Sequence, residues 1–201
     1  MKKFQLIAII ALLVSVNTYA QDTINFLNGK IKYVEVVPFD NDSLVKNVFI
    51  KKKSGKIKEV KKDNVFNVVF HDGKEVLIYK QDSLDDNYFT VEQARMYLLG
   101  AQDARKHYHS HFSKIFSVGV GAAGVSLAWY GLSFPVISLA AQDFLFKPNL
   151  TVRKGVSESY KENQYYLAGF ERAARNKKVA SGFIYGYIGY IAMVIITQNT
   201  K

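Results

Sequence analysis

The sequence predicts an α+β protein in which a small antiparallel β domain, an SH3-like barrel or strongly bent sheet, precedes a long helix and a transmembrane α-helical hairpin. Three observations predict this fold class. Strand-like runs joined by tight turns fill residues 21–82, two apolar stretches almost free of charge lie in the C-terminal half, and a further apolar segment opens the chain. A mean hydropathy close to zero is therefore the average of a polar domain and apolar segments.

Residues 1–20 have the features of a secretory signal. Lys2 and Lys3 precede an apolar run over 4–16, and Ala20 precedes the polar pair Gln21-Asp22. This order predicts an exported protein that is cleaved after Ala20. The alternative is an uncleaved membrane anchor, but the apolar run is short compared with the ~20 residues of a typical span. Export also argues against nucleic acid as a partner.

Residues 21–82 are predicted to form the exported β domain. The strand-like runs cover 23–27, 30–39, 44–52, 56–61, 65–70 and 75–79. The turn pairs between them are Asn28-Gly29, Ser54-Gly55 and Asp72-Gly73, in which glycine supplies the positive φ of two-residue hairpin turns. Small domains of this kind are usually binding modules. The lysine runs 51–53 and 61–62 are either solvated strand ends or a patch for an anionic ligand or lipid headgroup.

Residues 83–114 are predicted to form a polar linker and an amphipathic helix. Thr90 is a suitable N-cap and Glu92 lies in the first turn, one residue short of a capping box. Apolar residues recur at helical spacing from Val91 to Ala101, which favours packing on the membrane surface or on the β domain. The helix is expected to run without interruption into the first membrane span.

Residues 115–201 are predicted to form the membrane hairpin, with spans at about 115–134 and 179–197. Neither 115–142 nor 179–198 contains a charged residue, and at 1.5 Å per residue each stretch is long enough to cross a hydrocarbon core of ~30 Å. The alternative is a pair of buried helices in a soluble domain, which would need more apolar sequence around them than the chain offers. Pro135 ends or kinks the first span and leaves 136–146 open as a continuation, a re-entrant piece or an interfacial helix.

The distribution of charge predicts the orientation. The net charge is +10, and the loop 147–178, with eight basic and three acidic residues, holds the densest excess. Because short basic loops stay in the cytoplasm, the loop is predicted inside and both the β domain and Lys201 outside. The expected localisation is the inner membrane, with the N-terminal domain in the periplasm and the lipid bilayer as a partner. The basic residues 105, 106 and 114 lie outside in this topology and argue against it.

Small residues are expected to pack the helices together. The predicted packing positions are Gly100, Ala104, Gly169, Ala173, Gly182, Gly186 and Gly189, and Ser117, Gly121, Gly124 and Ala128 form a further small face on the first span. Small faces let helix backbones approach closely in lipid. They predict a close hairpin, or self-association through the glycine faces.

One of these glycine segments recurs. Tyr97-Leu98-Leu99-Gly100 is matched by Tyr166-Leu167-Ala168-Gly169, 69 residues later, and each copy precedes an apolar stretch. In the predicted topology a repeat would be inverted, with one copy on each side of the membrane. Chance, or the common needs of helix packing, is the alternative.

One group of residues suggests a metal site. Asp103, His107 and His111 recur at four-residue spacing on one face of the predicted helix, with His109 off that face. His107 and His111 are therefore candidate metal ligands, as paired helical histidines often are. Asp103 and His111 would lie ~12 Å apart along the axis, so one ion cannot bind all three side chains. The alternative is a solvated or headgroup-facing helix that responds to pH.

Composition and motifs exclude several activities. The chain has no cysteine, which excludes disulfides, thiolate zinc sites, a cysteine nucleophile and a lipid-modified N-terminal cysteine. It also contains no nucleophile elbow, P-loop, zinc-protease motif or dinucleotide fingerprint. No catalytic residue, cofactor or enzymatic activity is expected.

The order of these features resembles a group of uncharacterised exported proteins of Gram-negative bacteria. The residues that carry the resemblance are Val76-Leu77-Ile78-Tyr79-Lys80, Gly100-Ala101-Gln102-Asp103-Ala104-Arg105, Tyr166-Leu167-Ala168-Gly169-Phe170 and Ala174-Arg175-Asn176-Lys177-Lys178. Phe170 departs from the tyrosine expected in the group. The resemblance covers nearly all of the mature chain and implies the two-part architecture, but no activity.

The function expected from the sequence is that of a non-enzymatic, membrane-anchored binding or scaffolding protein of the cell envelope, with a protein partner or a second copy. Two alternatives remain open. The glycine faces and the span tyrosines would suit a small oligomeric pore or transporter-like subunit, and the histidines would suit a metal-responsive or pH-responsive sensor.

Overall fold

The computed structural model describes residues 21–39, 47–52, 54–82, 88–126, 136, 160 and 162–200. The chain divides into two compact units. The first comprises Met1–Ile24 and Lys32–Ile78, and the second comprises Asn25–Ile31 and Tyr79–Lys201. Most of the sheet belongs to the first unit, here called the β unit. The helices belong to the second, here called the helical unit.

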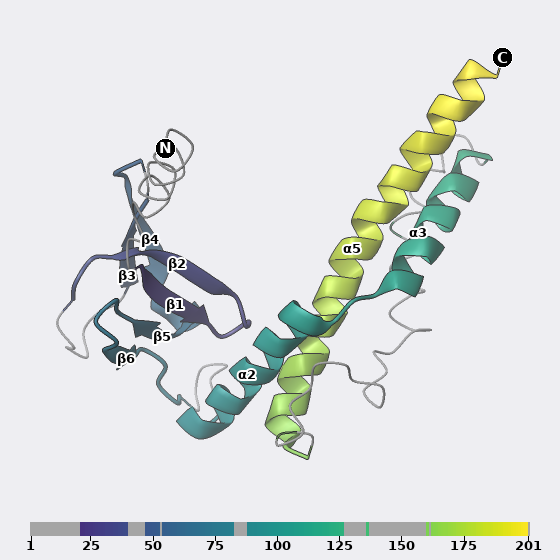
Figure 1. Cartoon of the computed structure of the whole chain (residues 1–201). Coiled ribbons are helices and arrows are strands. Elements are labelled where there is room, and N and C mark those ends of the chain that lie inside the picture. Colours follow the sequence, from purple (N-terminus) through teal and green to yellow (C-terminus); the bar gives the residue numbers. More distant parts are fainter. Residues whose placement is uncertain are drawn as a thin grey trace, which may run out of the picture. The chain divides into compact units, whose positions relative to one another are not determined.

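The β unit is built on an open antiparallel sheet of six strands (Figure 1). The strands are β1 (Asp22–Phe26), β2 (Ile31–Val36), β3 (Asn47–Lys51), β4 (Ile57–Lys61), β5 (Val65–Val69) and β6 (Glu75–Leu77), and a 3-10 turn, Lys62–Asn64, precedes β5. Their order in the sheet is β4-β3-β2-β1-β5-β6. Every predicted strand is present, but among the described residues the sheet is open and ends at β4 and β6, so the SH3-like barrel is not confirmed.

Three turns of one kind connect the hairpins. In the first, the amide of Gly29 donates to the carbonyl of Phe26 at 2.8 Å and the amide of Phe26 donates to the carbonyl of Lys30 at 2.9 Å. The same pair of bonds recurs around Gly55 and Gly73, and all three glycines have positive φ. Each is therefore a three-residue loop with a bulge glycine rather than the two-residue turn expected from sequence.

The strands differ in how they are buried, because β3 alternates between buried and exposed residues whereas four consecutive residues of β5 are buried. On β3, Val48 and Ile50 are buried while Phe49 between them is exposed. Ile50 lies opposite Val36 of β2, and both are buried. The buried apolar side chains of the β unit are Ile24, Val36, Val48, Ile50, Val65, Phe66, Val68 and Val76.

The helical unit contains α2 (Val91–His107), α3 (His111–Gly124) and α5 (Gln164–Asn199). Thr90 caps α2 in a complete capping box, because its hydroxyl accepts from the amide of Gln93 and the Gln93 side chain accepts from the amide of Thr90. Glu92 was the partner considered from the sequence, but glutamine at the third helical position serves the same purpose.

The helices differ from the sequence predictions in two places. The expected uninterrupted helix ends at His107, because Tyr108 has extended backbone and α3 begins only at His111. Helix α5 begins at Gln164, where the Asn163 side chain accepts from two backbone amides. Residues 164–178, predicted as part of a basic loop, are therefore the first turns of a helix ~54 Å long.

Candidate functional site

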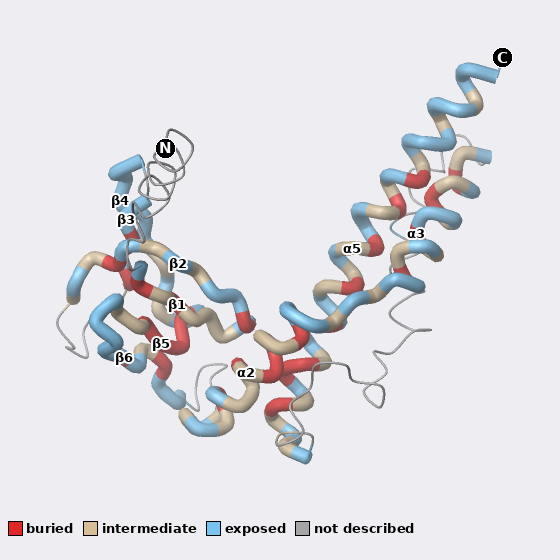
Figure 2. Tube along the Cα trace, viewed as in Figure 1, coloured by how far each residue is buried: buried red, intermediate tan, exposed pale blue. Residues whose placement is uncertain are grey.

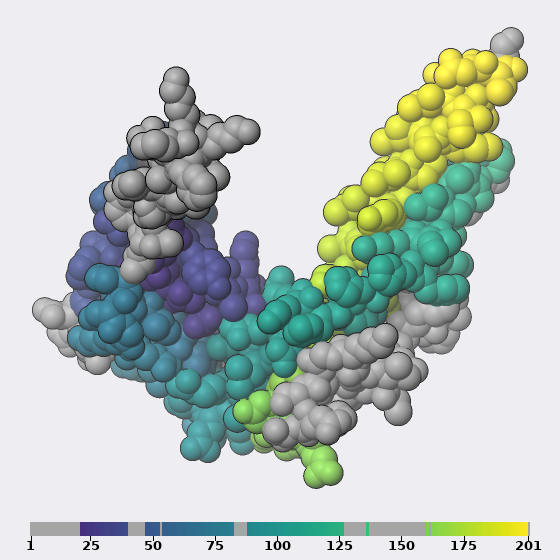
Figure 3. All heavy atoms as spheres, viewed as in Figure 1, coloured from purple at the N-terminus to yellow at the C-terminus, as the bar shows by residue number. Residues whose placement is uncertain are grey.

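Helices α2 and α3 pack along α5 in the same direction. Gly100 of α2 lies against Tyr166 and Phe170, whereas Gly121 of α3 lies against Gly186 and Tyr190. Residue numbers therefore rise together on both sides of the contact. Figure 1 shows the helices running in parallel, and Figure 3 shows the atoms of α3 and α5 in direct contact on the visible face.

The parallel direction corrects the predicted hairpin. In a hairpin the two limbs are antiparallel, so residues near the start of α3 would face residues near the end of α5. Instead the hydroxyl of Ser110, just before α3, lies 3.2 Å from that of Ser181. The apolar pattern of a helix is the same whether its partner runs parallel or antiparallel. At ~3.3 Å per residue, the chain between Ser126 and Gln164 is also long enough to return to the end at which α3 begins. The sequence alone could not distinguish the two arrangements.

Four glycines make this pairing close, in two reciprocal contacts. A Cβ at Gly100 would overlap the carbonyl oxygen of Tyr166, and a Cβ at Gly169 would overlap that of Tyr97. Further along, Gly121 faces the carbonyl of Gly186, and Gly189 faces the carbonyl of Val118. Each glycine thus meets the residue three positions before its partner glycine. Helix backbones approach this closely only where small residues such as glycine lie at the contact.

The small residues predicted to pack helices are buried wherever the structure describes them. They are Gly100, Ala104, Gly169, Ala173, Gly182, Gly186 and Gly189, together with Ser117, Gly121 and Gly124 on α3. Ala128 lies outside the described residues. Gly100, Gly121, Gly169 and Gly189 therefore face backbone of the same chain.

The two copies of the repeated segment lie side by side. The hydroxyl of Tyr166 donates to the carboxylate of Asp103 at 2.5 Å, and the guanidinium of Arg172 donates to the hydroxyl of Tyr97 at 3.4 Å. Tyr97 and Tyr166 are 69 positions apart in the sequence, and so are Asp103 and Arg172. The copies are therefore related by an approximate twofold axis parallel to the helices, and they are not inverted.

Tyr166 is the central side chain of this pairing. It is fully buried and belongs to a cluster with Phe170 and small residues of α2 and α5. Sequence reasoning assigned Asp103 to the histidine group and missed its bond to Tyr166. The repeat could have revealed this bond. Tyr97 precedes Asp103 by the same number of residues as Tyr166 precedes Arg172, so the tyrosine of each copy can bond to the polar residue of the other.

Replacing Tyr166 with phenylalanine is expected to lower the free energy of unfolding by about 2 kcal/mol. The ring still packs, but the carboxylate of Asp103 loses a donor, and hydrogen bonds to charged groups contribute ~1.5–3 kcal/mol. Tyr97→Phe is the matched control, with an expected loss below about 1 kcal/mol, because a contact of 3.4 Å to exposed Arg172 is weak. Thermal unfolding of the full chain by circular dichroism measures both. Equal losses in the two variants would contradict the assignment.

The histidines do not lie on one helix. His107 is the last residue of α2 and His111 is the first of α3, so the continuous face assumed in the metal hypothesis is absent. The ring of His109, expected to lie off that face, stacks on that of His111 at 5.8 Å. Within the described residues, no group of three or more metal-binding side chains occurs. Metal binding by His107 and His111 stays a prediction that the geometry does not favour.

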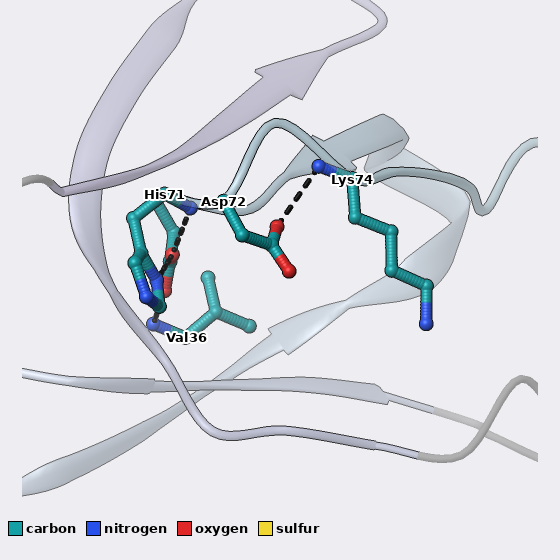
Figure 4. Close-up of polar contacts among 5 residues, drawn as sticks. Val36, His71, Asp72 and Lys74 are labelled. Carbon is teal, nitrogen blue, oxygen red and sulfur yellow. Dashed lines mark hydrogen bonds and ion pairs between the residues drawn. The ribbon is translucent and has the colours of Figure 1, made fainter.

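In the β unit, a buried carboxylate holds three segments together. Asp22 of β1 accepts from the amide of Val36 at 2.7 Å and from the amide of His71 at 2.9 Å (Figure 4). The His71 ring nitrogen lies 3.3 Å from the same carboxylate. The Asp22 side chain is 7% exposed and that of His71 is 64% exposed. Asp22 therefore braces the end of β2 and the turn before β6, and its geometry is that of a structural group.

The turn between β1 and β2 belongs to the helical unit. Gly29 lies in contact with Ala101, and the side chain of Gln102 donates to Asn25 at 3.0 Å. The guanidinium of Arg105 donates to the carbonyl of Asn28, also at 3.0 Å. Gly29 thus serves two purposes, since it supplies positive φ and leaves room for the α2 backbone. The tip of the first hairpin is attached to α2 by these contacts.

Many residues in the C-terminal half of α5 are exposed (Figure 2), and large apolar side chains are among them. They are Phe183, Ile184, Ile188, Ile191, Met193, Ile195 and Ile196, and on α3 they are Phe112, Ile115 and Val118. Among the described residues, α5 is the single helix long and apolar enough to cross a membrane. Residues 127–134 of the first predicted span and 137–146 lie outside the described residues.

The architecture is thus an N-terminal antiparallel sheet followed by helices, the last of them long and apolar. No family model, no curated protein and no solved structure matches the chain. The function is therefore inferred from the geometry of the helix pair and from its exposed surface.

Proposed function

We propose that the protein is a non-enzymatic binding or scaffolding protein, anchored in the inner membrane of the cell envelope by the apolar half of its helix pair. The observation that carries this proposal is the exposure of large apolar side chains around α5. Ile184 and Ile188 are 56% and 51% exposed, and Ile195 is 54% exposed. Water disfavours such a surface on a soluble protein, whereas lipid covers it without cost.

Parallel packing changes the proposed topology. If α5 crosses the membrane, its first residue lies on the same side as α2, and Thr200 lies on the other. The β1–β2 turn is bonded to α2, and its strands continue into the β unit, so the β unit is assigned to the side where α5 begins. The signal-like segment assigns that side to the periplasm. The C-terminus is then cytoplasmic, in contrast to the hairpin topology.

The exposed face of the sheet is the proposed binding surface. Tyr33, Phe49 and Ile57 are 63%, 45% and 65% exposed on neighbouring strands β2, β3 and β4. The exposed pair Lys51–Glu35 lies among these strands at 3.0 Å. Aromatic and apolar groups beside charges are typical of surfaces that bind proteins. The ionisable groups discussed above, Asp22 and Asp103, brace the backbone and the helix pair, which supports a non-enzymatic role.

Extraction of membranes tests the anchor. The full chain is expected to stay in the membrane pellet through high-salt and alkaline carbonate washes. Ile188→Lys with Ile191→Lys is expected to release it, because a lysine at the centre of a span costs about 3 kcal/mol. Ile57→Lys with Phe49→Lys adds the same charge to the exposed sheet face and is expected to leave the protein in the pellet. Release of the unaltered chain by carbonate would refute the anchor.

A further inference from the structure

Three cations converge where α2 ends and α3 begins. The ammonium of Lys177 donates to the backbone carbonyl of Arg105 at 2.7 Å. The ammonium of Lys114 lies over the ring of Tyr185, 5.2 Å from its centroid. Burial lowers the pKa of Lys177, and the nearby charges of Lys114 and Arg105 lower it further. Arg105, Lys114 and Lys177 are here called the junction cations.

Acidic residues are absent from the sequence around the junction cations. No aspartate or glutamate occurs between Ala104 and Ser126 or between Arg172 and Thr200. The nearest acidic residues in sequence have other partners. Asp103 accepts the hydroxyl of Tyr166, and Glu171 pairs with Arg175 at 3.4 Å. The positive charge at the junction is therefore not neutralised by carboxylates of these segments, and repulsion among its members favours a bound anion.

The junction cations lie next to the start of the exposed apolar surface. Ile115 follows Lys114 directly and is 73% exposed, and Phe183, 43% exposed, follows Lys177 by six residues. Six residues of helix span ~9 Å. A charge at this distance from the first lipid-facing side chains lies at the level of the headgroups when the apolar half is inserted.

We propose that Arg105, Lys114 and Lys177 bind the phosphate of anionic phospholipid headgroups on the side of the membrane where α5 begins. The inference rests on the proposed membrane anchor. It also gives a reason for basic residues on the periplasmic side, where the charge bias of membrane proteins does not place them. Each basic residue near the surface of an anionic membrane raises the binding affinity roughly fivefold.

The test uses the full chain purified in neutral detergent micelles, titrated with phosphatidylglycerol or with phosphatidylcholine. Phosphatidylglycerol is expected to raise the melting temperature and phosphatidylcholine to leave it unchanged. In R105Q/K114Q/K177Q the half-saturating concentration of phosphatidylglycerol is expected to rise on the order of a hundredfold. The matched control K52Q/K61Q/K62Q removes three lysines from the β unit and is expected to respond as the unaltered chain does.

Three outcomes overturn the proposal: equal responses to the two lipids, loss of the response in the β-unit control but not in the junction variant, or an equal response to inorganic phosphate. K114Q alone, which alters neither the bond of Lys177 nor that of Arg105, is expected to shift the titration about fivefold if the triple variant does not fold. Failure of headgroup binding is distinct from failure of the anchor, because R105Q/K114Q/K177Q retains the apolar half and is expected to resist carbonate extraction.

Discussion

Replacing Gly121 with alanine is expected to lower the free energy of unfolding by about 3 kcal/mol. A Cβ at this position would overlap the carbonyl oxygen of Gly186, and because the obstacle is backbone, the helices must separate to admit it. Overpacking of this kind costs ~1–3 kcal/mol where side chains can adjust, so a backbone contact lies at the upper end. Thermal unfolding of the full chain in neutral micelles, followed by circular dichroism, measures the loss.

Gly119 provides the matched control, two residues away on the same helix. Nothing lies within 4 Å of a Cβ at Gly119. Alanine there is expected to stabilise the protein by up to ~1 kcal/mol, since it restricts the unfolded chain and favours helix. The two substitutions are therefore expected to have opposite signs. Stabilisation by both would show that α3 and α5 are not in close contact.

Replacing Asp22 with alanine is expected to cost the β unit about 3 kcal/mol or more. The change leaves the amides of Val36 and His71 without their acceptor, and each hydrogen bond to a charged group contributes ~1.5–3 kcal/mol. Hydrogen exchange of the full chain measures this loss of stability, and we expect faster exchange in peptides that contain β2 and the turn after β5.

Asp72, in that same turn, is the control for Asp22. Its carboxylate accepts from the amide of Lys74 at 2.9 Å at an exposed position. Asp72→Ala is expected to cost less than about 1 kcal/mol, because water replaces the lost acceptor. Comparable acceleration of exchange in both variants would contradict the bracing role of Asp22.

The sheet could be predicted from sequence because its signals are local. Alternating apolar residues and glycine turns located all six strands, and Gly29, Gly55 and Gly73 have the positive φ that their turns require. The number of strands did not determine closure, since that depends on whether the edge strands meet. The barrel was therefore an expectation about long-range pairing, on which the turns carry no information.

The helices were predicted less well because their decisive features are not local. No glycine or proline occurs between Ala101 and Val118, so nothing in the sequence marks the interruption between α2 and α3. The sequence also does not mark the relative direction of α3 and α5, because a glycine face packs equally well against a parallel or an antiparallel helix. The inverted direction expected for a repeat followed from the predicted hairpin.

The packing positions themselves were predictable. Gly100 and Gly169 were identified from their four-residue spacing to alanine, and both lie at the reciprocal contact. The bond between Tyr166 and Asp103 was missed because the histidine spacing suggested another use for Asp103. A repeat therefore carries pairing information that the individual motifs do not.

Two sequence signals disagree once the helices are parallel. The signal-like segment predicts a periplasmic β unit, whereas the basic residues beside the start of α5 favour the cytoplasm. In the hairpin topology the basic loop and the β domain lay on opposite sides, so only the basic residues 105, 106 and 114 disagreed with the export signal. If the export signal determines the topology, the junction cations lie in the periplasm, where binding to anionic headgroups gives them a purpose.

The central claim is that α3 and α5 are parallel and that the β unit and the C-terminus therefore lie on opposite sides of the membrane. Labelling of single cysteines tests this claim most directly. The chain has no cysteine of its own, so each introduced thiol is the only target. A membrane-impermeant maleimide is expected to label Ser54→Cys in intact spheroplasts and Thr200→Cys only after permeabilisation. Labelling of both without permeabilisation, in protein that resists carbonate extraction, would place the two ends on one side and contradict the parallel arrangement.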